Sequence, residues 1–165
     1  MTPRQRTAIA ALVLSASGLV GIALDEGYTP QAVIPVKGDV PTIGFGTTYG
    51  VKMGDTTTPP KALARTMVDI EKTDSQIRRC VKVPLYQFEF DSMTSLAYNI
   101  GTKAFCASTV VKRLNKQDYA GACQAILLFK RANRYDCSLP GNARICGGVW
   151  KRRQKEYRQC LGETQ

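Results

Sequence analysis

Two carboxylates and one hydroxyl near the start of the chain have the types and spacing for acid–base chemistry. Glu26 follows a long uncharged run, and Asp39 lies in a turn after Gly38, three residues before Thr42. Apolar surroundings would keep the Glu26 carboxyl protonated, as a general acid requires. The turn leaves Asp39 exposed and ionised, and the Thr42 hydroxyl could hold a water molecule beside it. A protonated glutamic acid across a groove from an ionised aspartate is the arrangement that glycoside hydrolysis needs.

Each acid also has an ordinary structural interpretation. An aspartate in a glycine turn usually caps that turn, and a glutamate after a helix is usually solvated. The sequence contains no histidine, which excludes Ser-His-Asp triads, Cys-His dyads and the usual zinc hydrolase sites. Carboxylates are therefore the expected acid–base groups of any hydrolase, and we expect neither a metal nor an organic cofactor.

The segment before Glu26 is uncharged from residue 7 to residue 24, and Arg4 and Arg6 precede it. As a helix it would be roughly 27 Å long, just enough for a hydrocarbon core of about 30 Å. The positive residues predict a cytoplasmic N-terminus with the rest of the chain outside. Alanine, glycine and serine dilute the apolar residues, so the segment would be a weak anchor.

Four interpretations of this segment are open. It is a cleaved signal peptide with small residues at 15–17, a permanent anchor, an export segment that later leaves the bilayer, or a buried core helix. The weak hydrophobicity favours the third. We therefore expect an export segment at residues 1–24, transient inner-membrane association through residues 7–24, and a catalytic domain at residues 25–165.

The six cysteines all lie after the uncharged segment, at positions 80, 106, 123, 137, 146 and 160. An even number in an exported chain indicates disulfides formed in an oxidising, extracytoplasmic compartment. Metal binding is the alternative, but the chain has no Cys-x-x-Cys pair. Only one pairing is predicted, Cys137 with Cys146, because these two bracket a loop that contains Pro-Gly.

The formal net charge of +10 predicts an anionic partner. The basic residues are spread along the chain, with one cluster at residues 151–155, which a solvated helix face explains equally well. No nucleic-acid-binding motif accompanies them, and an exported protein rarely meets nucleic acid as a target. We expect a cell-wall polymer or a membrane surface as partner, and no nucleic acid.

The segment between residues 27 and 58 is rich in glycine, proline and β-prone residues, which predicts short strands at 32–34 and 40–45 with tight turns. Thr58 and the two prolines after it predict the start of a long helix that ends near Pro84. Its apolar stripe has five members at helical spacing: Leu63, Met67, Ile70, Ile77 and Val81.

Beyond Pro84 the pattern is helical with short interruptions. The predicted helices cover residues 87–100, 106–115, 118–131 and 150–161. The expected fold class is α+β, with a small β-containing N-terminal lobe, a long connecting helix and a helical C-terminal lobe. A cleft between two such lobes suits an extended polymer.

A set of motifs spread along the chain resembles a known family. Glu-Gly at 26–27 is followed by Pro-Thr-Ile-Gly-Phe-Gly-Thr-Thr at 41–48, and further stretches lie at 90–101, 105–114, 118–122 and 150–157. Together they resemble the phage-type lysozymes, a glycoside hydrolase family, and in particular phage endolysins. The resemblance covers roughly residues 25–161 and implies a lysozyme-like fold in a protein of a bacteriophage or prophage.

The resemblance implies a catalytic triad of Glu26, Asp39 and Thr42. Glu26 matches the family glutamate before glycine, and Thr42 matches the threonine that opens Thr-Ile-Gly. The family aspartate falls at Val36 here, so we assign its role to Asp39, the carboxylate in the loop. The implied reaction is hydrolysis of the β-1,4 bond between N-acetylmuramic acid and N-acetylglucosamine in peptidoglycan, with inversion favoured, by a monomer.

The uncharged segment resembles the signal-anchor-release segments of certain endolysins. Such enzymes are exported, wait tethered to the inner membrane, and reach the periplasm when the membrane is depolarised. No cysteine precedes Cys80, so a cysteine of the released segment cannot trigger activation. The resemblance then implies that the extracted segment packs against the body of the enzyme. A tether that ends at Leu24 would hold Glu26 at the bilayer and keep the enzyme inactive.

Two functions from other classes remain open. A lytic transglycosylase would cut the same bond with one glutamate and no water, and would leave 1,6-anhydro ends. A cationic, disulfide-rich protein that binds the wall or disrupts membranes without catalysis would also fit the net charge of +10.

Overall fold

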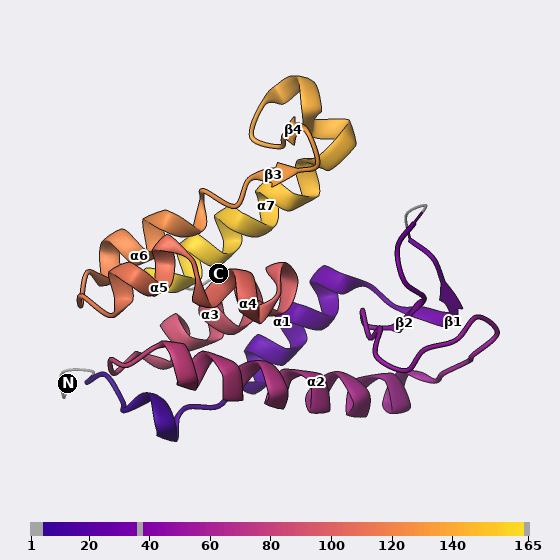
Figure 1. Ribbon diagram of the computed structural model, residues 1–165, viewed down its shortest axis with the longest axis horizontal. Coiled ribbons are helices and arrows are strands. Elements are labelled where there is room, and N and C mark those ends of the chain that lie inside the picture. The colour runs from indigo at the N-terminus through magenta and orange to yellow at the C-terminus, as the bar shows by residue number, and fades with distance from the viewer. Residues whose placement is uncertain (1–4, 36–37, 164–165) are drawn as a thin grey trace. The chain divides into compact units, whose positions relative to one another are not determined.

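The computed structural model describes residues 5–35 and 38–163 of the 165-residue chain. The chain divides into two compact units (Figure 1). The hairpin unit is Ala16–Lys72, and the helical unit is Met1–Ser15 together with Thr73–Gln165. The expected α+β class is confirmed, because helices dominate and the strands form two small antiparallel sheets.

The hairpin unit opens with helix α1 (Ala16–Glu26). The prediction that Glu26 lies at the end of a helix is confirmed. Gly27 ends the helix with a positive φ of 70°, and its N–H donates to the carbonyl of Ala23 at 3.1 Å. Glycine adopts this conformation without a side-chain clash, so the Glu-Gly pair fixes where the helix stops.

Two short strands follow α1 and lie next to each other in Figure 1. Strand β1 (Thr29–Val33) pairs antiparallel with β2 (Thr42–Gly44), with an irregular register in which Val33 faces Thr42. Both overlap the predicted strands. The hydrophobic cluster of this small sheet region consists of Ala32, Ile43 and Val51, all buried.

Helix α2 (Pro59–Cys80) begins at the predicted position, and Ile70, Ile77 and Val81 of the predicted stripe are buried. The prediction was wrong for the first two members of the stripe. Leu63 and Met67 are exposed, at 38% and 48%. The smaller Ala62 and Thr66 are buried instead. A Cβ atom on Gly44 would lie 2.7 Å from the Cβ of Ala62, so the β2 backbone comes directly against the helix. Small residues therefore form the buried face where backbone packs on α2.

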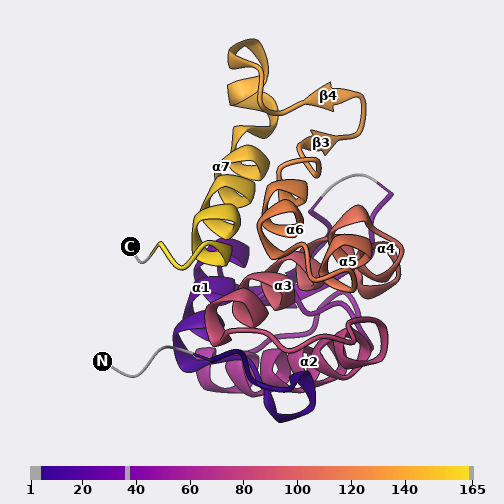
Figure 2. The ribbon, with the colours of Figure 1, turned by 90° about the vertical axis from the view of Figure 1, so that its left-hand side faces the viewer.

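The helical unit centres on α3 (Gln87–Ile100), whose bounds match the prediction. Residues 89–97 of this helix are all buried. Helix α7 (Ala143–Cys160) packs against α3 and against α6 (Tyr119–Ile126), as Figure 2 shows. Two short helices, α4 (Thr102–Cys106) and α5 (Thr109–Leu114), complete the unit.

Two of the predicted helices are shorter than expected. The prediction at 106–115 is interrupted because the Ser108 hydroxyl caps α5, accepting the Val111 N–H at 3.3 Å. The prediction at 118–131 was wrong beyond Ile126, where α6 ends. The chain then forms a hairpin of β3 (Arg131–Ala132) and β4 (Tyr135–Asp136), with Asn133 at a positive φ of 51° in its turn.

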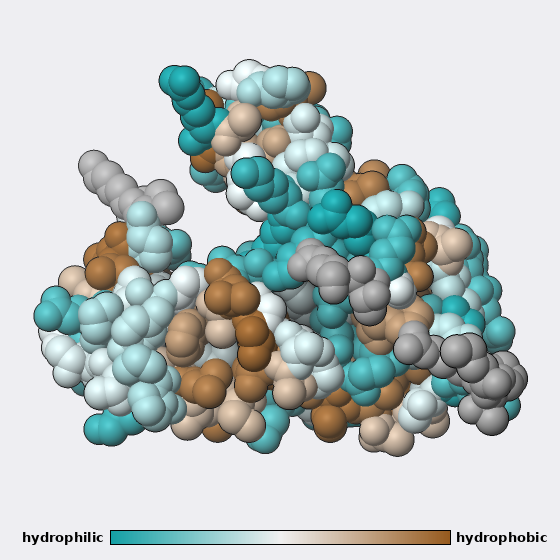
Figure 3. All heavy atoms as spheres, turned by 180° about the vertical axis from the view of Figure 1, so that it is seen from behind, coloured by the Kyte–Doolittle hydropathy of each residue, from teal (hydrophilic) through white to brown (hydrophobic). Residues whose placement is uncertain are grey.

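The hairpin β3–β4 and the 3-10 helix η2 (Pro140–Asn142) form an arm closed by a disulfide. The predicted pair of Cys137 and Cys146 is confirmed. Cys146 has non-helical φ and ψ of −147° and 22°, and it interrupts the first turns of α7. Helix α7 therefore begins earlier than the predicted start at residue 150, with an irregular first part. Figure 3 shows hydrophilic and hydrophobic patches side by side on this arm, at the top of the view.

The ionised carboxyl group of Asp136 binds two neighbouring side chains of the arm. The Ser138 hydroxyl donates to Asp136 Oδ1 at 2.6 Å, and the Lys130 ammonium lies 2.9 Å from Oδ2. These contacts, that of Ser138 first, lower the pKa of Asp136 to about 2. The carboxylate is therefore charged at neutral pH.

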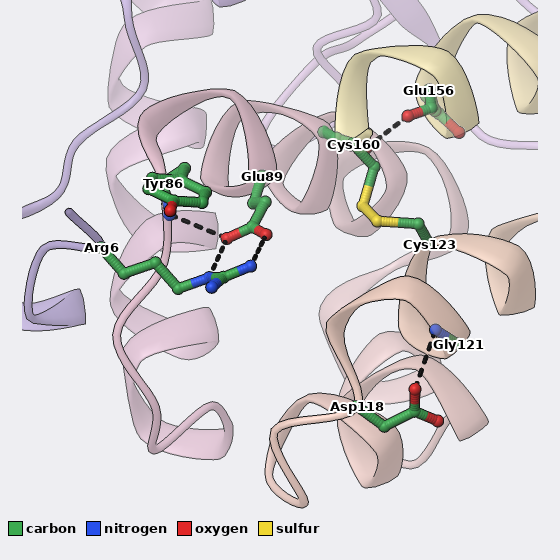
Figure 4. Close-up of a disulfide and its surroundings, with 9 residues drawn as sticks. Arg6, Tyr86, Glu89, Asp118, Gly121, Cys123, Glu156 and Cys160 are labelled. Atoms are coloured by element: carbon green, nitrogen blue, oxygen red, sulfur yellow. Dashed lines mark hydrogen bonds and ion pairs between the residues drawn. A yellow bond between two sulfur atoms is a disulfide. The ribbon is translucent and has the colours of Figure 1, made fainter. Parts of the chain in front are cut away.

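The other four cysteines join helices of the helical unit. Cys123 of α6 is bonded to Cys160 of α7, as Figure 4 shows, and Cys80 of α2 is bonded to Cys106 of α4. All six cysteines are thus in disulfides, as predicted for an oxidising compartment.

The uncharged segment is not one continuous helix in this structure. A short 3-10 helix, η1 (Ile9–Ala11), is followed by extended chain at Leu12, and α1 begins only at Ala16. Within residues 5–35 and 38–163, no helix is both long enough and apolar enough to cross a membrane.

Candidate active site

Glu26, the last residue of α1, lies against the backbone of Gly46 within the hairpin unit. A Cβ atom on Gly46 would be 3.0 Å from Glu26 Oε2 and 3.4 Å from Cδ. The Glu26 side chain is half-buried. Its carboxyl group therefore lies directly against the backbone of Gly46, where a side chain on that residue would crowd it.

A tight turn after β2 brings Gly46 to this position. Ile43 and Thr47 exchange backbone hydrogen bonds of 3.0 and 3.1 Å across the turn. Gly46 has a positive φ of 84°, a conformation that disfavours any residue with a side chain. The Thr47 hydroxyl donates to Asp69 Oδ2 of α2 at 3.2 Å, which ties the turn to the helix. The Thr-Ile-Gly-Phe-Gly motif thus encodes a turn that packs on Glu26.

Thr42 opens β2 and is half-buried. Its hydroxyl donates to the carbonyl of Val40 at 3.2 Å, which fixes the direction of the side chain. An oxygen in this orientation still has lone pairs with which to accept a hydrogen bond from water.

Asp39 is exposed in the loop before β2. Its Oδ1 accepts the N–H of the next residue, Val40, at 2.9 Å. Both side chains therefore bind the backbone of Val40, Asp39 at its N–H and Thr42 at its carbonyl. Val36, the position of the family aspartate, lies outside the described residues.

Sequence reasoning identified Glu26 but missed Gly46 and Asp69, which position the turn that packs against Glu26. The signal for Gly46 was present in the second glycine of the motif, whereas nothing local marks Asp69. In the part of the chain that the structure describes, no cluster of three or more histidine, cysteine, aspartate or glutamate side chains could bind a metal ion.

Comparison with known proteins decides the family. The phage lysozyme family matches residues 24–156, a span that begins just before Glu26 and includes most of both units. The chain belongs to the phage lysozyme family. Membership makes it a peptidoglycan-hydrolysing enzyme, and peptidoglycan is its substrate.

Individual members of the phage lysozyme family resemble the chain over most of its length. It is 34% identical over 152 residues to the SAR-endolysin of Pseudomonas phage phiKMV, covering 92% of this chain and 89% of the relative. It is 35% identical over 126 residues to the endolysin of Salmonella phage P22, covering 73% and 86%. The structure of the endolysin from Escherichia coli O157:H7 phage FAHEc1 matches with a TM-score of 0.78 and 31% identity, over 93% of this chain and 96% of the other. The expected lysozyme-like fold is confirmed.

Proposed function

We propose that this phage lysozyme hydrolyses the β-1,4 bond between N-acetylmuramic acid and N-acetylglucosamine, with Glu26 as the general acid. The observation that carries the proposal is the half-buried Glu26 carboxyl, held against Gly46 at the end of α1. Glu26 would give its proton to the leaving glycosidic oxygen, a contribution of about 100- to 10,000-fold to the rate.

Asp39 and Thr42 are proposed to act on the water that attacks the sugar. Asp39 is exposed and able to accept a proton from water, and the Thr42 hydroxyl, fixed by Val40, would orient the same water. Attack from the face opposite the leaving group inverts the anomeric carbon. Inversion requires carboxyl groups about 6.5–9.5 Å apart, which leaves room for the water.

Replacing Asp39 by asparagine is expected to lower the rate of peptidoglycan hydrolysis by about 100-fold or more, because the base is lost. The rate is measured as clearing of purified peptidoglycan by the purified full-length chain. Asp55→Asn is the matched control, since Asp55 also caps a loop, accepting the N–H of Lys52 at 2.9 Å. If Asp39→Asn and Asp55→Asn are equally active, Asp39 is not the base.

We further propose that residues 1–24 export the enzyme to the periplasm and hold it, inactive, at the inner membrane until release. This proposal separates an export segment from a catalytic domain at residues 25–165. It is supported by the charge-free stretch after Arg6, by the six oxidised cysteines and by the similarity to a SAR-endolysin. In the released enzyme, residues 16–24 would form most of α1, the helix that ends at Glu26.

Exchanging residues 8–24 for a cleavable signal peptide is expected to give a periplasmic protein that never enters the membrane fraction and does not lyse the cell. The reason is that α1 would be missing and Glu26 would lose the helix that positions it. Cell fractionation and lysis curves of the exchanged and natural chains, expressed in parallel, measure both effects. Full lytic activity of the exchanged chain would rule out a structural role for the segment.

A further inference from the structure

The start of the helical unit contacts three carboxyl groups that are almost completely buried. Asp74, Glu89 and Asp91 are 3%, 3% and 4% exposed. A buried carboxylate is costly unless hydrogen bonds or a cation compensate it. Each of the three receives such partners from residues 6–15, which we call the docking segment.

Arg6 occupies a closely fitted site in this unit (Figure 4). Its Nε and Nη2 donate to the two carboxylate oxygens of Glu89 at 3.1 and 2.8 Å. Its guanidinium carbon lies 3.5 Å from the ring centre of Tyr119 and 4.4 Å from that of Tyr86. The site therefore combines a two-pronged ion pair with two aromatic faces, a geometry that suits arginine rather than lysine.

Glu89 also holds the start of α3. Its Oε2 accepts the backbone N–H of Tyr86 at 2.8 Å, as part of a capping box. The ion pair with Arg6 thus closes onto a carboxylate that the helix already fixes in place. The hydrogen bonds from Arg6 to Glu89 raise the pKa of Arg6 above its ordinary value, so the cation is kept.

The other two carboxylates bind the end of the docking segment. The N–H of Leu14 donates to Asp74 Oδ2 at 3.1 Å, and the Thr94 hydroxyl donates to Oδ1 at 2.9 Å. The N–H and hydroxyl of Ser15 donate to Asp91 at 3.0 and 2.5 Å. Burial raises the pKa of Asp74, and the hydrogen bonds from Thr94 and Leu14 act in the opposite direction. Asp74 and Asp91 thus hold the chain immediately before α1 begins.

Backbone and apolar contacts lie between these two ends. Thr7 and Leu85 exchange backbone hydrogen bonds of 2.8 and 2.9 Å. The Leu12 side chain is 4% exposed and belongs to the main core of the helical unit. The docking segment is therefore an integral part of the helical unit, although it precedes helix α1, which belongs to the hairpin unit.

We propose that the docking segment acts as a latch. Once it has bound the helical unit after release, the ion pair of Arg6 with Glu89 locks it there and prevents the chain from returning to the membrane. This inference rests on the membrane-held state proposed above. While the uncharged segment spans the bilayer, Arg6 marks its cytoplasmic end; after release, the same guanidinium occupies the site formed by Tyr86, Glu89 and Tyr119. Return to the membrane would then leave Glu89 buried without its cation.

Hydrogen exchange on the purified full-length chain tests the latch without any membrane. Arg6→Gln is expected to speed exchange of the Thr7, Leu14 and Ser15 amides by about 10- to 100-fold, because a broken buried pair lowers the free energy of local opening. Arg4→Gln removes the same charge two residues before Arg6, outside the docking segment, and is the control. Arg6→Lys keeps the charge but cannot form the two-pronged ion pair. Its exchange rates should therefore lie between those of Arg6→Gln and Arg4→Gln. Equal exchange in all four proteins would overturn the latch.

Binding to vesicles of phosphatidylethanolamine and phosphatidylglycerol tests whether the lock prevents return. The natural chain and Arg4→Gln should stay in the supernatant after centrifugation, whereas Arg6→Gln should sediment with the vesicles. Arg6→Gln that remains in the supernatant as fully as the natural chain contradicts the one-way role. Failure of the membrane-held state itself has a different signature, since the natural chain would then never enter the membrane fraction of cells.

Discussion

Glu26→Gln is expected to lower the rate of peptidoglycan hydrolysis by about 100- to 10,000-fold while leaving the fold intact. Glutamine keeps the size and the polarity of the side chain but has no proton to give to the leaving oxygen. Because the Glu26 side chain is only half-buried and ends α1, the amide can take the same place beside Gly46. The loss should therefore appear in the catalytic rate and not in the thermal unfolding midpoint.

The neighbouring acid supplies the control for this substitution. Asp25→Asn makes the same acid-to-amide change one residue earlier on α1, so a general effect of losing an acidic side chain at this helix end would weaken both variants alike. We expect Asp25→Asn to keep hydrolysis close to that of the natural chain. Near-normal hydrolysis by Glu26→Gln would remove Glu26 from the mechanism.

Gly46→Ala is expected to reduce hydrolysis by about 100-fold, since a shift of the order of 1 Å in a catalytic group has that effect. The added methyl group would lie 3.0 Å from Glu26 Oε2 and 3.4 Å from Cγ, so the carboxyl must move. The positive φ of 84° adds a loss of stability of about 1–2 kcal/mol. Hydrolysis rates and denaturant unfolding of the same preparation separate the two effects.

Gly50 provides a matched control in the same unit. It also has a positive φ, 70°, but a Cβ atom there would meet nothing within 4 Å. Gly50→Ala should therefore lose similar stability and retain hydrolysis. If both alanine variants lose activity to the same extent, backbone strain and not displacement of Glu26 is responsible.

The sequence predicted an element well where local signals agree. The bounds of α3 follow from Pro84 shortly before it and from Gly101, at a positive φ of 85°, directly after it. The uncharged segment was different, because composition alone suggested one continuous helix. Leu14 and Ser15 instead bind carboxylates 60 and 76 residues further along the chain, which no local pattern encodes.

The candidate site follows the same rule, because its local features were predictable and its long-range contacts were not. Local residue types place Glu26 after an uncharged run and Thr42 within the predicted strand at 40–45. The structure puts Glu26 at the end of α1 and Thr42 at the start of β2. The contact of Glu26 with Gly46 depends on a turn that Asp69 of α2 anchors, and this is tertiary information. The same holds for the first turns of α2, where the close approach of Gly44 places Ala62 rather than Leu63 in the buried face.

The central claim is that this member of the phage lysozyme family is a muramidase that adds water across the bond it cuts. Mass spectrometry of the muropeptides released from purified peptidoglycan tests it most directly, because it reports the bond and the chemistry together. The account predicts products that end in a reducing N-acetylmuramic acid and that Glu26→Gln does not release. Products ending in 1,6-anhydro-N-acetylmuramic acid, or lysis of cells with the glycan strands intact, would contradict it.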